Sequence, residues 1–163
     1  MSLRLASGEV VVDRLCSHLH PGVAPLLPKV LARIDSKGGR LLLVEEVDFG
    51  RPIGESSCVP TGPEDEIVYA RRRGRFGISR FVKNRQPEPC SAVTVVLKRD
   101  FVSGVYVILT AYIGYTAPPE PWDDDATEES AEFWSSRALV WGVEPVDPGT
   151  ETTISPPWKV AVK

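Results

Sequence analysis

Two histidines lie close together near the start of the chain, and the sequence has no others. His18 and His20 occur in the segment CSHLHPG. Imidazole titrates near neutral pH, which suits it to general acid–base catalysis. In an extended strand, residues two apart point to the same face, so the pair predicts an acid–base site. The same spacing would serve two metal ligands, but no third nitrogen or sulfur ligand follows, so we assign no metal ion and no cofactor.

A basic segment, ARRRGRFGISRFVKNR, spans residues 70–85 and contains no acidic residue. In a strand over 77–82, Arg80 would share a face with apolar neighbours, and a guanidinium buried in this way needs an anionic partner. Arginines beside aromatic rings suit RNA, because they offer both phosphate contacts and stacking. We therefore predict Arg80 as a catalytic residue, with three ligand-binding neighbours: Phe81, Lys83 and Arg85.

An acidic segment, EPWDDDATEESAE at residues 120–132, has no basic residue. Two interpretations of this charge reversal stay open. The basic and acidic segments pair with each other inside the protein, or the basic segment binds RNA or another anionic ligand. If the protein is instead a non-enzymatic interaction protein, its exposed acidic loop would meet a basic protein partner.

The segment GVYVILTAYIG at residues 104–114 has the strongest strand pattern. Strict alternation places Thr110 and Tyr112 on one face with Tyr106 and Ile108. The opposite face is more apolar and is predicted to face the core. Thr110 and Tyr112 are therefore predicted catalytic residues that present hydroxyl groups to a pocket.

The remaining pattern predicts an α+β protein with one globular domain over residues 1–163. We expect a mostly antiparallel meander sheet, packed by an N-terminal helix and a C-terminal helix. The N-terminal helix would begin between Ala24 and Leu27 and stop at Gly38-Gly39; the C-terminal helix would cover 126–142. Residues 9–16 could start either a strand or a helix. Strands are expected at 40–50, 67–72, 77–82, 91–99 and 104–114, with a short one at 158–162, and 91–99 should pair antiparallel with 104–114.

Composition and charge limit where the protein is expected to work and what it is expected to bind. The net charge of −3 gives the whole molecule no attraction to nucleic acid or membranes, so any such attraction must be local. No apolar run reaches membrane-spanning length, and the charged N-terminus is unlike a signal peptide. Three widely spaced cysteines, Cys16, Cys58 and Cys90, indicate ordinary thiols. We therefore expect a cytoplasmic protein with no membrane partner.

The segment SAVTVVLKRDFVSGVYVILTAYIG, preceded by SRFVKNR, resembles the core of the metal-independent bacterial ribonuclease toxins of the barnase/EndoU/colicin/RelE-like superfamily. The resemblance extends over about 40 residues and is one of fold. It implies a helical N-terminal part followed by a meander of strands. It also implies that the strand ending in TAY contributes a hydroxyl to the site.

The resemblance implies RNA cleavage by the ribose 2′-hydroxyl, with His18 or His20 as base or acid. Arg80, with Lys83 or Arg85, would hold the phosphate, and Thr110 and Tyr112 would orient it. Two other functions remain open. One is a non-enzymatic binding or interaction protein; the other is a metal-dependent hydrolase that uses both histidines and Asp123 to Asp125.

Overall fold

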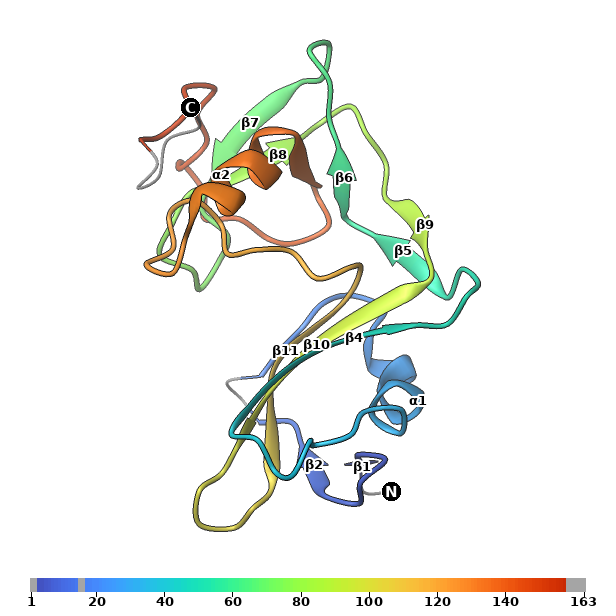
Figure 1. The fold of residues 1–163 in the computed structure, drawn as a ribbon. Helices are drawn as coiled ribbons and strands as arrows, with labels where there is room; N and C mark the ends of the chain where they lie inside the picture. The colour runs from blue at the N-terminus through green and yellow to red at the C-terminus, as the bar shows by residue number, and fades with distance from the viewer. Residues whose placement is uncertain (1–2, 15–16, 158–163) are drawn as a thin grey trace. The chain divides into compact units, whose positions relative to one another are not determined.

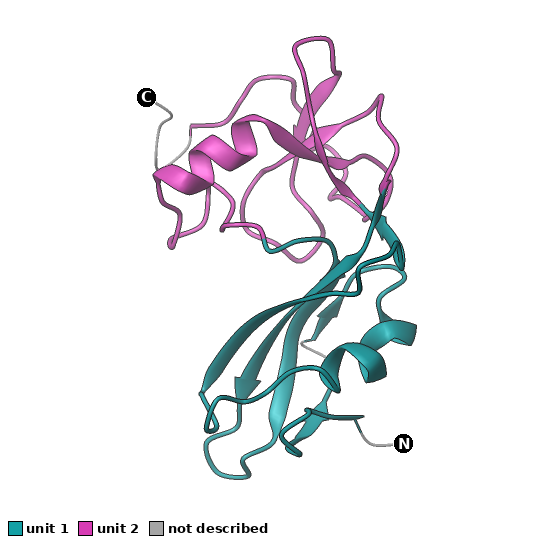
Figure 2. Cartoon of the chain, turned by 45° about the vertical axis from the view of Figure 1, so that its right-hand side comes forward, with its two compact units in different colours: residues 1–56, 89–116 teal, residues 57–88, 117–163 magenta. Residues whose placement is uncertain are grey.

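The computed structural model describes residues 3–14 and 17–157. Cys16 and the strand expected at 158–162 lie outside these residues. The chain forms two compact units, coloured separately in Figure 2. Unit 1 comprises residues 1–56 and 89–116, and unit 2 comprises residues 57–88 and 117–163. The chain passes between the units three times, and the single domain expected from the sequence stays a prediction.

Unit 1 is built on a six-stranded mixed sheet (Figure 1). Its strands are β1 (Leu3–Arg4), β2 (Val10–Val12), β3 (His18–Leu19), β4 (Leu42–Asp48), β10 (Ala92–Arg99) and β11 (Tyr106–Ile113). The order is β1-β2-β11-β10-β4, and β3 pairs with β11 as well.

The strand directions in unit 1 confirm one prediction and correct another. β10 and β11 form the expected antiparallel hairpin, and β4 is antiparallel to β10. In contrast, β2 and β3 run parallel to β11, so the sheet is mixed rather than a meander. Parallel pairing requires a long crossover, and here the chain passes through the N-terminal helix, β4 and β10 before β11 completes it.

A bulge interrupts β11. Ile108 lies opposite Leu97 of β10 and Thr110 lies opposite Val96, so Leu109 is the additional residue with no partner in that register. One extra residue shifts the alternation of side chains between the two faces of a sheet. Leu109 is 36% exposed, as expected for a residue at such a switch.

The bulge corrects the predicted faces of β11. Tyr106 and Ile108 are fully buried before the bulge, whereas Ala111 and Ile113 are the buried residues after it. The prediction that Thr110 and Tyr112 share a face with Tyr106 and Ile108 was therefore wrong. The prediction assumed that side chains alternate between the two faces without interruption. An inserted residue breaks this alternation, and only the pairing with β10 reveals it.

One face of this sheet is covered by a 3₁₀ turn, η1 (Ala24–Leu26), and the short helix α1 (Leu27–Leu31). The predicted helix start is confirmed, but the helix ends at Leu31, well before Gly38-Gly39. The chain then turns, and the Ser36 N–H donates to Ser7 Oγ at 2.9 Å. The apolar core between helix and sheet is formed by buried side chains including Val30, Leu31, Leu43, Val95, Leu97 and Ile108.

Unit 2 contains a four-stranded mixed sheet of order β6-β12-β8-β7. Its strands are β6 (Cys58–Pro60), β7 (Ile67–Ala70), β8 (Ser79–Val82) and β12 (Arg137–Val140). β12 pairs antiparallel with β6 and parallel with β8, while β7 and β8 are antiparallel. Its apolar residues form two small buried clusters, one around Phe81 and Trp134 and one around Val59 and Val82.

The helix of unit 2, α2 (Glu128–Ser135), is shorter than predicted. Its start is confirmed: the Thr127 N–H donates to Ser130 Oγ at 3.0 Å in a capping box. The prediction of helix for residues 137–142 was wrong, since Arg137–Val140 is strand β12. Those residues lie between β6 and β8, and the two ladders of backbone hydrogen bonds outweigh local helix propensity.

Two further strands, β5 (Gly54–Ser56) and β9 (Glu88–Cys90), pair with each other as a small sheet. The described residues thus contain both helix and sheet, with sheet dominant. Among them, neither helix is long and apolar enough to cross a membrane.

Candidate functional site

The two histidines lie on unit 1, beside the end of β11 that carries the predicted hydroxyl residues. His18 is opposite Thr110 in the parallel pairing of β3 with β11, and the His20 N–H donates to the Ala111 carbonyl at 2.9 Å. Leu19, between the histidines, packs against the apolar core. Because residues alternate along the strand, that anchor directs both imidazoles to the opposite, outer face of the sheet.

The aromatic rings of this cluster are in contact. The ring centroids of His18 and His20 are 4.8 Å apart at an interplanar angle of 87°, and those of His20 and Tyr112 are 5.5 Å apart at 57°. All three side chains are half-buried. We call His18, His20, Thr110 and Tyr112 the histidine cluster. It combines two titratable imidazoles with two hydroxyl groups on one surface.

The bulge in β11 makes this cluster possible. It places Thr110 and Tyr112 on the outer face, whereas regular alternation from Tyr106 would have turned both side chains into the core. His18, His20, Thr110 and Tyr112, which the sequence predicts as catalytic residues, are therefore brought together in unit 1. They meet on the outer face of the sheet, as predicted for Thr110 and Tyr112, whereas Tyr106 and Ile108 lie in the core.

A row of polar residues that the sequence did not suggest extends from Tyr112 across the same face. Thr94 of β10 lies opposite Tyr112, and Glu46 of β4 lies opposite Thr94. Thr94 Oγ1 donates to the Gly114 carbonyl at 2.9 Å, and Glu46 accepts the Thr116 N–H at 2.7 Å. Only the register between three strands groups these residues, because they are far apart in the chain.

Arg80 lies in unit 2, on β8. Its Nη1 donates to Thr61 Oγ1 at 2.9 Å and to the Arg137 carbonyl at 2.8 Å. Both acceptors are neutral oxygens, whereas the sequence led us to expect a carboxylate or a phosphate. These contacts orient the guanidinium, and the charge of Arg80 also acts on the Asp65 carboxylate, whose pKa it helps to lower.

The three predicted ligand-binding residues also lie in unit 2, in different environments. Phe81 is 1% exposed and its ring packs edge-on against Trp141, with centroids 5.4 Å apart, so Phe81 is a core residue in this structure. Lys83 is exposed, with Nζ 5.1 Å from the Trp141 ring centroid. Arg85 Nε contacts Asp65 Oδ1 at 2.9 Å, and this hydrogen bond holds the pKa of Asp65 below its ordinary value.

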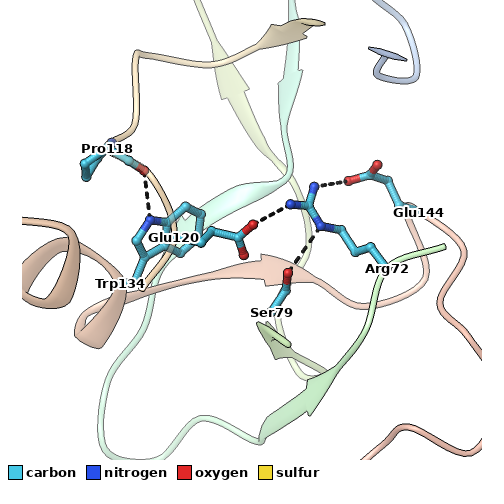
Figure 3. Close-up of polar contacts among 6 residues, drawn as sticks. All are labelled: Arg72, Ser79, Pro118, Glu120, Trp134 and Glu144. Atoms are coloured by element: carbon cyan, nitrogen blue, oxygen red, sulfur yellow. Dashed lines mark hydrogen bonds and ion pairs between the residues drawn. The ribbon is translucent and has the colours of Figure 1, made fainter. Parts of the chain in front are cut away.

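The strongest charge cluster in unit 2 is centred on Arg72, which sequence reasoning did not single out (Figure 3). Arg72 is 9% exposed, and its guanidinium contacts Glu120 at 2.5 Å and Glu144 at 3.4 Å. Its Nε donates to Ser79 Oγ at 3.3 Å. For Arg72 and Glu120, internal pairing of the basic and acidic segments is thus the observed arrangement.

The acidic loop before α2 is organised by its own backbone. The Asp123 N–H donates to the Glu120 carbonyl at 2.9 Å, and the Asp125 N–H donates to Asp123 Oδ1 at 2.9 Å. These aspartates belong to unit 2 and the histidines to unit 1. A metal site formed by both groups remains a hypothesis.

The two described cysteines are free thiols. Burial raises the pKa of Cys58 to about 12, so its nucleophilic thiolate form is scarce at neutral pH. Cys90 is buried, with Sγ 3.7 Å from the Ala92 carbonyl oxygen. Neither residue has the properties of a catalytic nucleophile.

Comparisons of the chain with models of known protein families, with curated proteins and with solved structures find no match. The resemblance to ribonuclease toxins therefore stays a prediction, and the argument for function rests on the site itself.

Proposed function

We propose that this protein cleaves RNA without a metal ion, with His18 and His20 as its acid–base pair. The observation that carries the proposal is the contact between the two imidazoles, 4.8 Å between centroids, beside the hydroxyl residues of β11. Cleavage at a ribose requires one group to accept a proton and another to donate one, and two adjacent imidazoles meet that need.

In the proposed reaction, one neutral imidazole accepts the proton of the ribose 2′-hydroxyl. The 2′-oxygen forms a bond to the adjacent phosphorus, and the bond from phosphorus to the 5′-oxygen breaks. The other histidine, protonated at the outset, donates its proton to that leaving oxygen. The products are a 2′,3′-cyclic phosphate and a 5′-hydroxyl, and the enzyme ends with its two protonation states exchanged.

Thr110 and Tyr112 are the positioning groups in this scheme. Thr110 lies opposite His18 in the strand register, and the Tyr112 ring adjoins the His20 ring, so both residues neighbour the histidines. A hydroxyl that donates to a phosphate oxygen stabilises the charge that develops there in the transition state. Arg80, Lys83 and Arg85 are proposed as phosphate contacts elsewhere on the RNA, and their contribution should weaken as salt is raised.

The direct test uses an oligonucleotide with a single ribose in an otherwise DNA strand, incubated with the full-length protein in EDTA. We expect cleavage only after that ribose, with a cyclic phosphate end identified by mass spectrometry. His18→Ala and His20→Ala should each lower the rate by about 10²–10⁴-fold, the usual contribution of general acid–base catalysis. The rate of cleavage by the wild-type protein should rise and then fall as the pH is increased.

Tyr115→Phe is the matched control, because Tyr115 is 54% exposed and its hydroxyl contacts Asp48 and Ser91 rather than the histidine cluster. It should leave the rate unchanged, while Tyr112→Phe lowers it. Equal cleavage by every variant would identify a contaminating nuclease and overturn the proposal. Cleavage lost in EDTA would favour the metal-dependent hydrolase, and no cleavage at all would favour a non-enzymatic binding protein.

A further inference from the structure

The connection between β7 and β8 presents two arginines and an aromatic ring at the surface of unit 2. Phe76 is 97% exposed, Arg73 is exposed and Arg75 is half-buried. Among the described residues, the Arg73 side chain has no hydrogen bond or ion pair. We call Arg73, Arg75 and Phe76 the basic turn. A ligand can reach these side chains, whereas Arg72 and Phe81 of the same basic segment are buried.

Arg72 holds the start of the basic turn. Its buried guanidinium contacts Glu120 and Glu144 (Figure 3), and its carbonyl accepts the Arg75 N–H at 3.0 Å. Within this tight turn, Gly74 has a φ of +80°, which favours glycine. The backbone that carries Arg73 and Arg75 is therefore fixed by a buried ion cluster beneath it.

Trp122 holds the other end of the basic turn. Its ring lies so close to the Gly77 backbone that a Cβ there would come within 1.9 Å of the ring. Trp122 belongs to the same acidic segment as Glu120, so both ends of the turn rest on that segment. A turn that is ordered before a ligand arrives loses less conformational entropy on binding.

The charge of Arg75 favours an anionic ligand. Burial, and next the charge of Arg72, lower the pKa of Arg75, although Glu144 and Glu120 act in the opposite direction. An anion beside this guanidinium would stabilise its protonated form. Phe76 follows directly in the chain and presents an exposed ring, and a cation next to such a ring suits a phosphate next to a base.

A second exposed phenylalanine shows how much the neighbouring charge matters. Phe101 is 89% exposed in the connection between β10 and β11. It follows Asp100, whose carboxylate accepts the Val102 N–H at 2.9 Å and the Ser103 N–H at 3.0 Å. A carboxylate at this position repels a phosphate. Of these two exposed rings, only Phe76 is flanked by cations.

We propose that the basic turn binds single-stranded RNA, with Phe76 stacked on an unpaired base and Arg73 and Arg75 contacting nearby phosphates. The choice of RNA rests on the proposed function, but these residues take no part in its proton transfers. The sequence indicated Phe81 as the aromatic contact, and the structure buries that ring. Bases in a duplex are already stacked and paired, so a single strand is the form that an exposed ring binds.

The test is fluorescence anisotropy of a labelled single-stranded RNA that carries a 2′-O-methyl group on every ribose and so cannot be cleaved by its 2′-hydroxyls. Phe76→Ala should raise the Kd about 5–150-fold, the range for one lost stack of a base on an aromatic ring. Phe76→Trp should restore the affinity. Arg73→Ala should reduce the slope of log K against log salt by about 0.7, the value for one phosphate contact on a single strand.

The matched controls are Phe101→Ala and Arg51→Ala, which remove an exposed ring and an exposed arginine of unit 1. Phe101→Ala should leave the Kd unchanged, and Arg51→Ala should leave the salt slope unchanged. Circular dichroism should show the same folded spectrum for every variant, because all four positions lie in exposed connections.

Failure of this inference can be told apart from failure of the proposed cleavage. A wild-type protein that does not bind the methylated strand, or a Phe76→Ala variant that binds it equally well, would overturn the role of the basic turn whatever the cleavage assay shows. Binding that depends on Phe76 without cleavage of an ordinary ribose would support the basic turn and contradict the cleavage. Phosphatidylserine vesicles that bind through Phe76, with no binding of the strand, would overturn RNA as the ligand.

Discussion

The two units of this chain are stabilised in different ways. Unit 1 has one continuous apolar core between its helix and its sheet, and its polar chemistry lies on the outer face. Unit 2 has two small apolar clusters, and beside them a buried arginine with two glutamates. Apolar burial tolerates the loss of one contact in a graded way, whereas a buried ion cluster depends on every partner. The comparison predicts which substitutions each unit tolerates.

The largest effect should follow Arg72→Ala in unit 2. The substitution removes the guanidinium that contacts Glu120 and Glu144, which should lower the free energy of unfolding by about 3–5 kcal/mol. Urea denaturation followed by tryptophan fluorescence measures it, since Trp122, Trp134 and Trp141 all lie in unit 2. If the free energy of unfolding fell by less than the contribution of one exposed ion pair, the Arg72 network would not stabilise unit 2.

Leu97→Ala should have the next largest effect, this time in unit 1. Leu97 is fully buried in the core, and truncation there should cost about 2–5 kcal/mol. Unit 1 has no tryptophan, so tryptophan fluorescence follows unit 2 alone, whereas circular dichroism follows the backbone of both units. Because the chain passes between the units three times, we expect both signals to shift together. If Leu97→Ala left the unfolding transition seen by tryptophan fluorescence unchanged, the two units would be independent domains.

Acid should affect the two units through different contacts. The pKa of Asp48 in unit 1 is lowered chiefly by the Gly50 N–H, and that of Asp65 in unit 2 chiefly by Arg85. A carboxylate whose folded pKa is lowered stabilises the protein above its unfolded pKa, and this contribution disappears as pH falls through the folded value. Stability should therefore decrease below about pH 4, near the ordinary aspartate pKa.

The matched variants are Asp48→Asn and Asp65→Asn, measured by denaturation at several pH values. Each should make stability less dependent on pH in the acidic range. High salt should reduce the contribution of Asp65, which faces a cation, more than that of Asp48, whose donors are neutral. Equal sensitivity to salt would contradict the assigned contacts.

The smallest effect should come from Arg71→Ala, the neighbour of Arg72. Arg71 pairs with Asp147 at 2.9 Å, but its side chain is 43% exposed, and such pairs contribute about 0–1 kcal/mol. The same denaturation experiment measures it and serves as the control for Arg72→Ala. A loss as large as that of Arg72→Ala would mean that burial does not distinguish the two arginines.

The histidine cluster shows what could be predicted of the site. The H-x-H spacing implied two rings on one face, and the strand pattern identified Thr110 and Tyr112. Their proximity follows from the parallel pairing of β3 with β11, a contact between segments about 90 residues apart. No local pattern specifies such a pairing, because it depends on how the crossover folds.

The basic segment shows the opposite case. The sequence drew attention to Arg80 as the partly buried arginine that needs an anion, yet Arg72 holds Glu120 and Arg80 contacts neutral oxygens. Alternation within one strand indicates only which side chains share a face. It does not identify the side chain that lies opposite, which the packing of β8, β12 and the acidic loop decides.

By itself, the sequence determined the local elements: the β10–β11 hairpin, the start of each helix and the two histidines on one face. Those features depend on side-chain periodicity, capping residues and short connections, which act over a few residues. Only the tertiary structure decided the bulge at Leu109, the strand at Arg137–Val140 and the burial of Arg72. Each of these depends on partners distant in the chain, whose hydrogen bonds and charges outweigh the local preference.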